Sequence, residues 1–317
     1  MILKKKARHS RGDFETSIGN VFKIFSILFF LFITIFPFYW MLNLSFRPYG
    51  DVSLNPSRMV PRWSDIKTVF TPFSCLVDLE TETCRQAISN SSYSAVLINY
   101  NFLGFIKNSL IISSVTVILN LIIAVPAAYA TTRLDFRGRN LMNWIILLIY
   151  MFPSIVISIP LFVFFVRLQN LLGIQLRSPM GVAVIYLAGT LPLCLHMLRG
   201  YFESIPKELE EAARIDGASR LEVILKITIP LAAPVIATVA LYIFMVAWNE
   251  FLYALLFLVD NPDGWTLPLG LQQLDNQEVP STFLMAGSAI ISIPIIILYF
   301  FLQRFLKAGL TAGGVEE

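Results

Sequence analysis

The chain has 317 residues, of which 56% are hydrophobic and only 14% are charged, and its formal net charge is +3. Soluble domains carry about 25% charged residues, so this chain has too few charges to cover a water-soluble globule of its size. The small net charge, with no Lys/Arg-rich array among aromatic residues, also argues against nucleic acid as a partner. We therefore expect a surface that faces membrane lipid.

Six charge-free windows are each long enough to cross a bilayer as a helix, which takes about 20 apolar residues. In chain order they are Ile24–Leu44, Asn108–Thr132, Asn140–Val166, Ser178–Leu198, Ile227–Asn249 and Val279–Gln303. The fifth continues past Glu250 to Val259. One such window alone is also compatible with a buried core helix, but six together predict an all-α, polytopic membrane protein. The transmembrane domain then covers residues 24–306, with tails at 1–23 and 307–317.

The basic residues are shared unevenly between the two sides of this topology. Six spans place both termini on one side, which carries fifteen Lys and Arg residues against seven on the other. Positive residues are retained in the cytoplasm, so both tails are expected there. The basic N-terminal lead precedes an apolar run that is too long for a signal peptide and has no small-residue cleavage site, which indicates an uncleaved first span.

The loop between the first two spans, about residues 46–105, is expected outside the cell membrane. It contains Cys75 and Cys84, which can form a disulfide in an oxidising compartment or remain two free thiols. Cys194 lies inside the fourth window and is interpreted as a small packing residue. Prolines inside the windows favour helices that line a path, because their freed backbone groups are tolerated beside a cavity or a neighbouring helix. These prolines are Pro37, Pro126, Pro153, Pro160, Pro192, Pro234 and Pro294.

The cytoplasmic loop at about residues 199–228 is the most charged stretch and has its own helix signals. Ser204 is expected to cap a short helix over Lys207–Ile215, with Pro206 in its first turn. Gly217 supplies the left-handed residue that ends such a helix. The sequence Ser219–Glu222 has the form of a capping box, so a second helix should begin there at once.

The short helix is suited to docking on a partner. Ala212 and Ala213 allow a close approach, and Leu209 and Ile215 offer apolar anchors, as in helix-in-groove recognition. Its charged residues are expected to form pairs at the rim of the contact; they are Lys207, Glu208, Glu210, Glu211 and Arg214. An ordinary solvated amphipathic loop is the alternative interpretation.

The same stretch resembles the EAA loop of ATP-binding-cassette importer permeases. That pattern is Glu-Ala-Ala, three residues, Gly, nine residues, Ile, one residue, Leu-Pro. Here it reads Glu211-Ala212-Ala213, Gly217, Ile227 and Ile229-Pro230, with Ile in place of Leu. Other segments, in the expected order, resemble the maltose-permease G-type subunits of the carbohydrate-uptake branch. They are PFYWMLNLSFRP, IKNSLIISS, AAYATTRLDFRGR, AWNEFLYAL and QRFLKAGLTAGG.

The resemblance implies a six-helix ABC type I importer permease in the plasma (inner) membrane of a prokaryote. The short helix would be the coupling helix, seated in a cleft of an ATP-hydrolysing subunit. The implied partners are a second permease, two ATP-binding subunits and a periplasmic or lipid-anchored solute-binding protein. The implied coupling residues are Glu211, Ala212, Ala213, Asp216, Gly217, Ile227 and Pro230.

The sequence holds no sign of catalysis by this chain itself. It contains no G-x-x-x-x-G-K-[ST] phosphate loop, so ATP and Mg are expected on the partner subunits and no cofactor on this chain. His9 and His196 have no neighbours at metal-ligand spacing, and no G-x-S-x-G elbow is present.

Candidate residues for the solute path are Trp248, Asn249 and Glu250. An acid within an apolar segment faces a partner or a wet cavity, so Glu250 either lines the path or a gate, or pairs with a neighbouring helix and holds the bundle. Trp265, in the polar loop after the fifth span, is a candidate contact for the solute-binding protein. The alternative is a polar connector with one interfacial Trp.

The resemblance thus implies import of a sugar or oligosaccharide, with maltose- or trehalose-like solutes expected. The same machinery importing a polyamine, glycerol-phosphate or another polyol is the alternative. An ion-driven secondary carrier would need two or more intramembrane ionisable groups, and only Glu250 qualifies.

Overall fold

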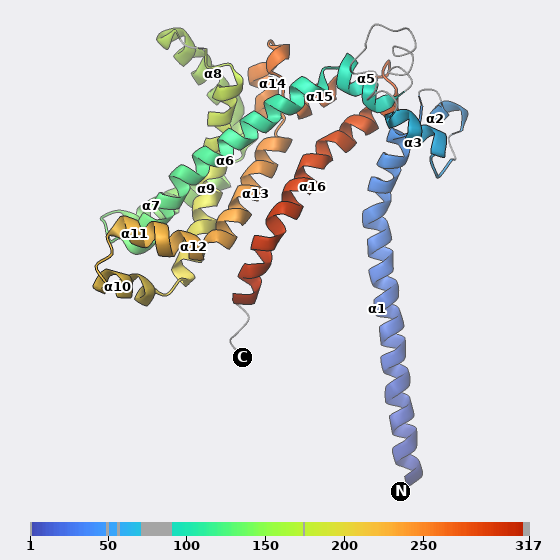
Figure 1. Ribbon diagram of the computed structural model, residues 1–317, viewed down its shortest axis with the longest axis horizontal. Coiled ribbons are helices and arrows are strands. Elements are labelled where there is room, and N and C mark those ends of the chain that lie inside the picture. The colour runs from blue at the N-terminus through green and yellow to red at the C-terminus, as the bar shows by residue number, and fades with distance from the viewer. Residues whose placement is uncertain (1, 49–50, 56–57, 71–90, 174, 313–317) are drawn as a thin grey trace. The chain divides into compact units, whose positions relative to one another are not determined.

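The computed structural model describes residues 2–48, 51–55, 58–70, 91–173 and 175–312, and the regular structure in these residues is helical (Figure 1). The predicted all-α class is therefore confirmed. The chain divides into two compact units, one formed by Met1–Ala95 with Glu278–Ala289 and the other by Val96–Gln277 with Ile290–Glu317. Two helices, α5 (Ser92–Asn99) and α16 (Ser281–Ala312), run from one unit into the other along the chain.

The first unit begins with the long helix α1 (Ile2–Ser45), whose part Phe22–Ser45 is apolar and long enough to cross a membrane. Asn43 near its end donates to the Met59 carbonyl at 2.8 Å. Helices α2 (Asp51–Leu54) and α3 (Trp63–Phe70) follow, and Arg58 pairs with an acid on each of them. Cys75 and Cys84 lie outside the described residues, so their bridge stays a prediction.

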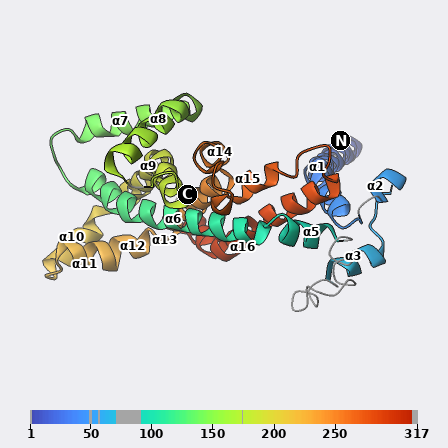
Figure 2. The ribbon, with the colours of Figure 1, turned by 90° about the horizontal axis from the view of Figure 1, so that it is seen from above.

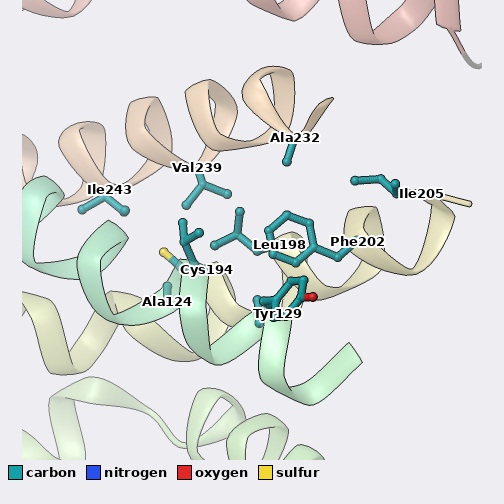
Figure 3. Close-up of a cluster of buried hydrophobic side chains, with 11 residues drawn as sticks. Ala124, Tyr129, Cys194, Leu198, Phe202, Ile205, Ala232, Val239 and Ile243 are labelled. Carbon is teal, nitrogen blue, oxygen red and sulfur yellow. The ribbon is translucent and has the colours of Figure 1, made fainter. Parts of the chain in front are cut away.

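The second unit is built around three helices, α6 (Phe102–Arg133), α9 (Pro179–Ser204) and α13 (Ala233–Asn249). Figure 3 shows their side chains gathered in one cluster, in which Ala124, Cys194 and Leu198 are fully buried. Helices in lipid associate by close packing and interhelical hydrogen bonds rather than by the hydrophobic effect. The small Ala124 and Cys194 allow that packing, and Cys194 is a packing residue as predicted.

A buried polar contact also joins two of these helices. Asn120 on α6 donates from its amide to the hydroxyl of Thr190 on α9 at 2.8 Å, and both residues are buried. Such a contact favours one register of the two apolar helices, because sliding would break a hydrogen bond between them in a medium without water.

The third predicted span, Asn140–Val166, is wrong as a single helix. The chain forms α7 (Arg139–Met151) and α8 (Ser154–Leu172), which are separated at Phe152 and Pro153. Proline has no N–H to donate and disfavours helical geometry at the residue before it, and Phe152 is extended, with φ −78° and ψ 128°. Only Ser154–Leu172 is long and apolar enough to span.

The fifth span also differs from the predicted window at Ile227–Asn249. Helix α13 is preceded by α11 (Arg220–Val223), a π-helical segment (Ile224–Thr228) and α12 (Ile229–Leu231). The pair Arg220–Leu231 and Ala233–Asn249 is bent by 74°. With this bent pair as one span, the described residues contain up to six candidate membrane crossings.

Past α13 the chain does not continue as one helix to Val259. It breaks at Glu250 and forms α14 (Leu252–Leu258), a 3-10 turn (Pro262–Gly264) and α15 (Leu267–Gln272). Buried residues of α14 and α15 pack into a second cluster with α6 and α9. The last apolar segment, Ser281–Gln303, lies within α16 and matches the sixth predicted span closely.

Candidate functional site

The predicted short helix is present as α10 (Lys207–Ile215) with the expected bounds. Its N-cap is Pro206, however, and the predicted cap at Ser204 is wrong. Ser204 is the last residue of α9, and its hydroxyl donates to the carbonyl of Tyr201 at 2.7 Å. The serine therefore serves the preceding helix, and Pro206 begins α10 without an N–H that would need a partner.

The turn after α10 has the geometry that its glycine predicts. Gly217 adopts φ +89°, and the N–H of Ala218 reaches back to the carbonyl of Ala213 at 3.0 Å. This is the left-handed end of a helix, which residues with a Cβ adopt only under strain. Gly217 therefore fixes the direction in which the chain leaves α10.

A capping box then begins α11, as predicted. The N–H of Glu222 reaches the Ser219 hydroxyl at 3.3 Å, and the Glu222 carboxylate accepts from the Ser219 N–H at 3.0 Å. Lys226 adds a third contact to the same carboxylate at 2.9 Å. The two helices are thus joined by a short turn whose polar groups form hydrogen bonds with one another, and we call this turn the corner between α10 and α11. Figure 1 shows α10 and α11 close to α12.

The remaining motif residues, Ile227 and Pro230, lie one helical element further along. Ile227 is in the π-helical segment and Pro230 is in α12, just before the 74° bend. Short π-helical segments are frequent at functional sites. Here the segment connects the corner of α10 and α11 to the fifth span.

Glu210 is the residue that sequence reasoning placed wrongly. It was expected at the rim of α10, but its side chain is only 4% exposed. One carboxylate oxygen accepts from Arg133 Nε at 2.9 Å and from the Thr228 hydroxyl at 3.3 Å, and the other accepts from the Tyr129 hydroxyl at 3.1 Å. Arg133 also donates to the carbonyl of Ile205 at 2.7 Å.

We call Glu210, Arg133, Tyr129 and Thr228 the Glu210 cluster. It joins α10 to the last turns of α6 and to the π-helical segment. The local sequence held no signal for this burial, because Glu210 is three residues before Ala213 and so shares a helix face with a residue that was expected at the docking contact. A buried acid needs a cation, and Arg133 at the end of the second span was available.

The outward surface of α10 and α11 remains uncovered by this chain. Glu211, Ala212, Asp216 and Gly217 are exposed, and Ala213 is half-buried. Four large apolar side chains surround them, with exposed fractions of 47% to 86%. They are Leu209, Ile215, Leu221 and Leu225. Leu209 and Ile215 are exposed as expected, whereas Leu221 and Leu225 were not singled out in the sequence.

The three path candidates occupy different environments. The indole of Trp248 is fully buried and donates to the carbonyl of Ile291 at 3.0 Å. Asn249 is exposed, and its side-chain amide donates to the carbonyl of Met245. Glu250 is half-buried at the helix break, where its carboxylate accepts from the N–H of Tyr253 at 2.9 Å and of Ala254 at 3.3 Å. Glu250 therefore caps the start of α14.

Trp265 is anchored within its own unit. Its indole donates to the carbonyl of Leu258 at 3.0 Å, and its ring lies 5.9 Å from the ring of Phe105. Asn108 on α6 donates to the Trp265 carbonyl at 3.0 Å. Its contact with a binding protein stays a prediction. Within the described part of the chain, no group of three or more His, Cys, Asp or Glu side chains is placed to hold a metal ion.

Comparison with known proteins places these features in a family. Residues 120–311 match the family model described as "Binding-protein-dependent transport system inner membrane component". The matched range includes the Glu210 cluster, the corner at Gly217 and the bent fifth span.

Two curated relatives match along nearly their whole length. The inner membrane ABC transporter permease protein YcjP of Escherichia coli is 35% identical over 291 residues, which cover 90% of this chain and 93% of the relative. The trehalose/maltose transport system permease protein MalG of Thermococcus litoralis is 33% identical over 304 residues, or 95% of this chain and 99% of the relative.

A solved structure supports the fold. A chain of a bacterial ABC transporter involved in the import of the acidic polysaccharide alginate matches with a TM-score of 0.69. The match covers 90% of this chain and 96% of that chain at 23% identity. The predicted ABC importer permease fold is confirmed.

Proposed function

The chain belongs to the family of binding-protein-dependent transport system inner membrane components, and we propose that it is the permease subunit of an ATP-driven sugar importer. Several relatives are permease proteins of transport or uptake systems for trehalose, maltose, arabinooligosaccharides and diacetylchitobiose. By this likeness the solute is a sugar or oligosaccharide. A second permease completes the path, two ATP-binding subunits power it, and a solute-binding protein delivers the sugar.

One observation carries the mechanism: the Glu210 cluster ties an exposed docking surface to the spans by buried contacts. The ATPase subunit would hold the outward surface of α10 through Leu209 and Ile215, with Glu211 at its edge. Any displacement of α10 is then passed through Glu210 to Arg133 on α6 and to Thr228 in the π-helical segment.

The contacts of Glu210 with Arg133 and Thr228 reach two elements that would move when the permease changes between its inward-open and outward-open states. Helix α6 lies in the core of the second unit, and the π-helical segment leads into the bent fifth span. A buried ion pair resists stretching because separating its charges in a low-dielectric interior is unfavourable. The Glu210 cluster thus forms a rigid connection between the docking surface and the spans.

The orientation follows from the same proposal. The docking surface is cytoplasmic, because ATP is in the cytoplasm, and this agrees with the excess of basic residues on that side. Both termini are then cytoplasmic. ATP and Mg are held by the partner subunits, since this chain has no phosphate loop in its sequence.

Transport in proteoliposomes tests the proposal. The chain, its partner permease, the ATPase and the binding protein are reconstituted together, and uptake of labelled trehalose, maltose and a glycerol-phosphate is measured. We expect uptake of a sugar that requires ATP and the binding protein. Uptake by the chain alone along an ion gradient, or uptake of glycerol-phosphate without any sugar, would contradict it.

A further inference from the structure

A cavity outside the coupling surface lies between α6, α7 and α9. It encloses about 220 Å³ and is lined by Thr131 of α6, Asn143 and Ile146 of α7, and His196, Arg199 and Glu203 of α9, among others. A shallower hollow of about 290 Å³ shares Asn143 and Arg199 with it and adds Asn140 and Trp144. The two spaces are therefore neighbours. Figure 2 shows α7 alongside α9, the two helices that supply most of the cavity lining.

The polar wall of the cavity presents two opposite charges side by side. Arg199 Nε donates to Glu203 Oε1 at 2.9 Å, one helical turn away, and both side chains are partly exposed. This contact engages one of the five N–H donors of the guanidinium and one of the two carboxylate oxygens. The pair can therefore accept a ligand that carries an anion next to a cation.

Phosphate and a primary ammonium are the matching groups. A guanidinium recognises phosphate through paired N–H donors, and a carboxylate accepts hydrogen bonds from a primary ammonium. Asn143, next to the pair, can donate to a phosphate oxygen or accept from the ammonium. A purely anionic ligand would leave Glu203 facing a like charge.

The outer face of α7 indicates that this ligand is a lipid. Leu141, Trp144 and Leu148 are 65%, 71% and 68% exposed, and Trp144 also lines the shallow hollow. Tryptophan is enriched where a membrane protein crosses from lipid headgroups to acyl chains. The polar cavity thus opens beside an apolar helix face along which acyl chains can lie.

We propose that this cavity binds the headgroup of phosphatidylethanolamine. Arg199 donates to the phosphate, Glu203 accepts from the ammonium, and the acyl chains lie along Leu141, Trp144 and Leu148. The site requires only that the chain is a membrane protein, and it does not depend on which solute is transported.

Native mass spectrometry of the intact transporter tests the site, with phosphatidylethanolamine, phosphatidylcholine or phosphatidylglycerol added in turn. We expect the native protein to retain phosphatidylethanolamine most strongly, because the quaternary ammonium of phosphatidylcholine has no N–H to donate and phosphatidylglycerol has no ammonium. Arg199→Gln should weaken all three, by about tenfold for the loss of one charge-assisted contact. Glu203→Gln should weaken phosphatidylethanolamine and spare phosphatidylglycerol.

Arg167→Gln, the same change at an exposed position of α8, is the matched control and should leave retention unchanged. Ile146→Trp fills the cavity without removing a charge and should expel phosphatidylethanolamine even if the charge variants assemble poorly. Equal retention by Arg199→Gln and Arg167→Gln, an equal effect of Glu203→Gln on phosphatidylethanolamine and phosphatidylglycerol, or full retention by Ile146→Trp would overturn the proposal. Displacement of the lipid by free phosphoethanolamine at similar affinity would overturn it in favour of a soluble ligand.

Discussion

Glu210 on α10 and Arg133 at the end of α6 form an ion pair at 2.9 Å in which each side chain is only 4% exposed. Seventy-seven positions separate them in the chain, so the pair fixes α10 to the end of α6, a helix from a much earlier part of the sequence. Tyr129 and Thr228 donate two further hydrogen bonds to the carboxylate. A buried charge satisfied in this way is costly to disturb on one side only.

Glu210→Ala should therefore destabilise the protein more than any change on the exposed face of α10. Removing the carboxylate leaves the Arg133 charge buried without its partner, which costs about 3–5 kcal/mol. We expect a lower melting temperature of the purified transporter and loss of sugar-stimulated ATP hydrolysis. Glu211→Ala, at the neighbouring exposed position, is the control and should leave the melting temperature unchanged.

The double variant Glu210→Leu with Arg133→Met separates stability from coupling. Replacing both charges by apolar side chains removes the unpaired charge, so much of the stability should return. Coupling should stay impaired, because the ion pair that connects α10 to α6 is absent. Full recovery of sugar-stimulated ATP hydrolysis in this double variant would show that the pair only stabilises the fold.

Gly217→Ala should impair coupling through the backbone alone. No atom lies within 4 Å of the added Cβ, yet φ at this position is +89°, and holding a residue with a Cβ there costs about 1–2 kcal/mol. We expect the corner between α10 and α11 to change direction and the ATPase to copurify less. Gly217→Asn should lose less, since Asn tolerates this conformation better, and a larger loss with Asn than with Ala would contradict the explanation.

Gly217 and Glu210 show what the sequence can and cannot predict. The signals for Gly217 and for the Ser219–Glu222 box are local, because the atoms involved are only a few residues apart, and both were predicted correctly. Glu210 was misplaced because its burial depends on Arg133, a contact that no local pattern encodes. The break at Pro153 was missed for a different reason: a charge-free window records apolar length and not helix continuity, and the prolines inside the windows were interpreted only as a sign of helices that line a path.

Ile215→Ser should weaken docking without affecting the fold. The Ile215 side chain is 86% exposed, and substitutions at such positions change stability by about 0.5 kcal/mol or less. An apolar anchor in an interface contributes more than about 1 kcal/mol, so the affinity for the ATPase subunit should fall by about tenfold. Copurification and a melting curve measure the two effects.

Val60→Ser provides the control for Ile215→Ser, since Val60 is 65% exposed in the loop before α3. It should change neither copurification nor the melting temperature. An unaltered ATPase affinity in Ile215→Ser would remove this face of α10 from the interface.

Glu250→Gln distinguishes the two interpretations of the intramembrane acid. The carboxylate caps α14 by accepting from the N–H groups of Tyr253 and Ala254, and an amide oxygen can still accept one of these bonds. We expect a KM for sugar transport close to that of the native protein and a small loss of stability. Glu250→Ala removes the cap and should lower stability by about 1 kcal/mol. A KM raised severalfold in Glu250→Gln would instead place the acid in the sugar path.

Two substitutions at Trp265, in the loop after the fifth span, distinguish a structural role from a contact with the solute-binding protein. The Trp265 indole bonds the Leu258 carbonyl, and its ring packs near Phe105, so Trp265→Ala should lower stability, by less than the ~3–5 kcal/mol of a fully buried aromatic side chain because Trp265 is half-buried. Trp265→Phe keeps a ring beside Phe105 and loses only the hydrogen bond, which contributes about 1 kcal/mol. If the indole also contacts the solute-binding protein, Trp265→Phe should raise the transport KM while the melting temperature falls only slightly. An unchanged KM in Trp265→Phe, with a large fall in melting temperature in Trp265→Ala, would confine this residue to holding the loop against α6.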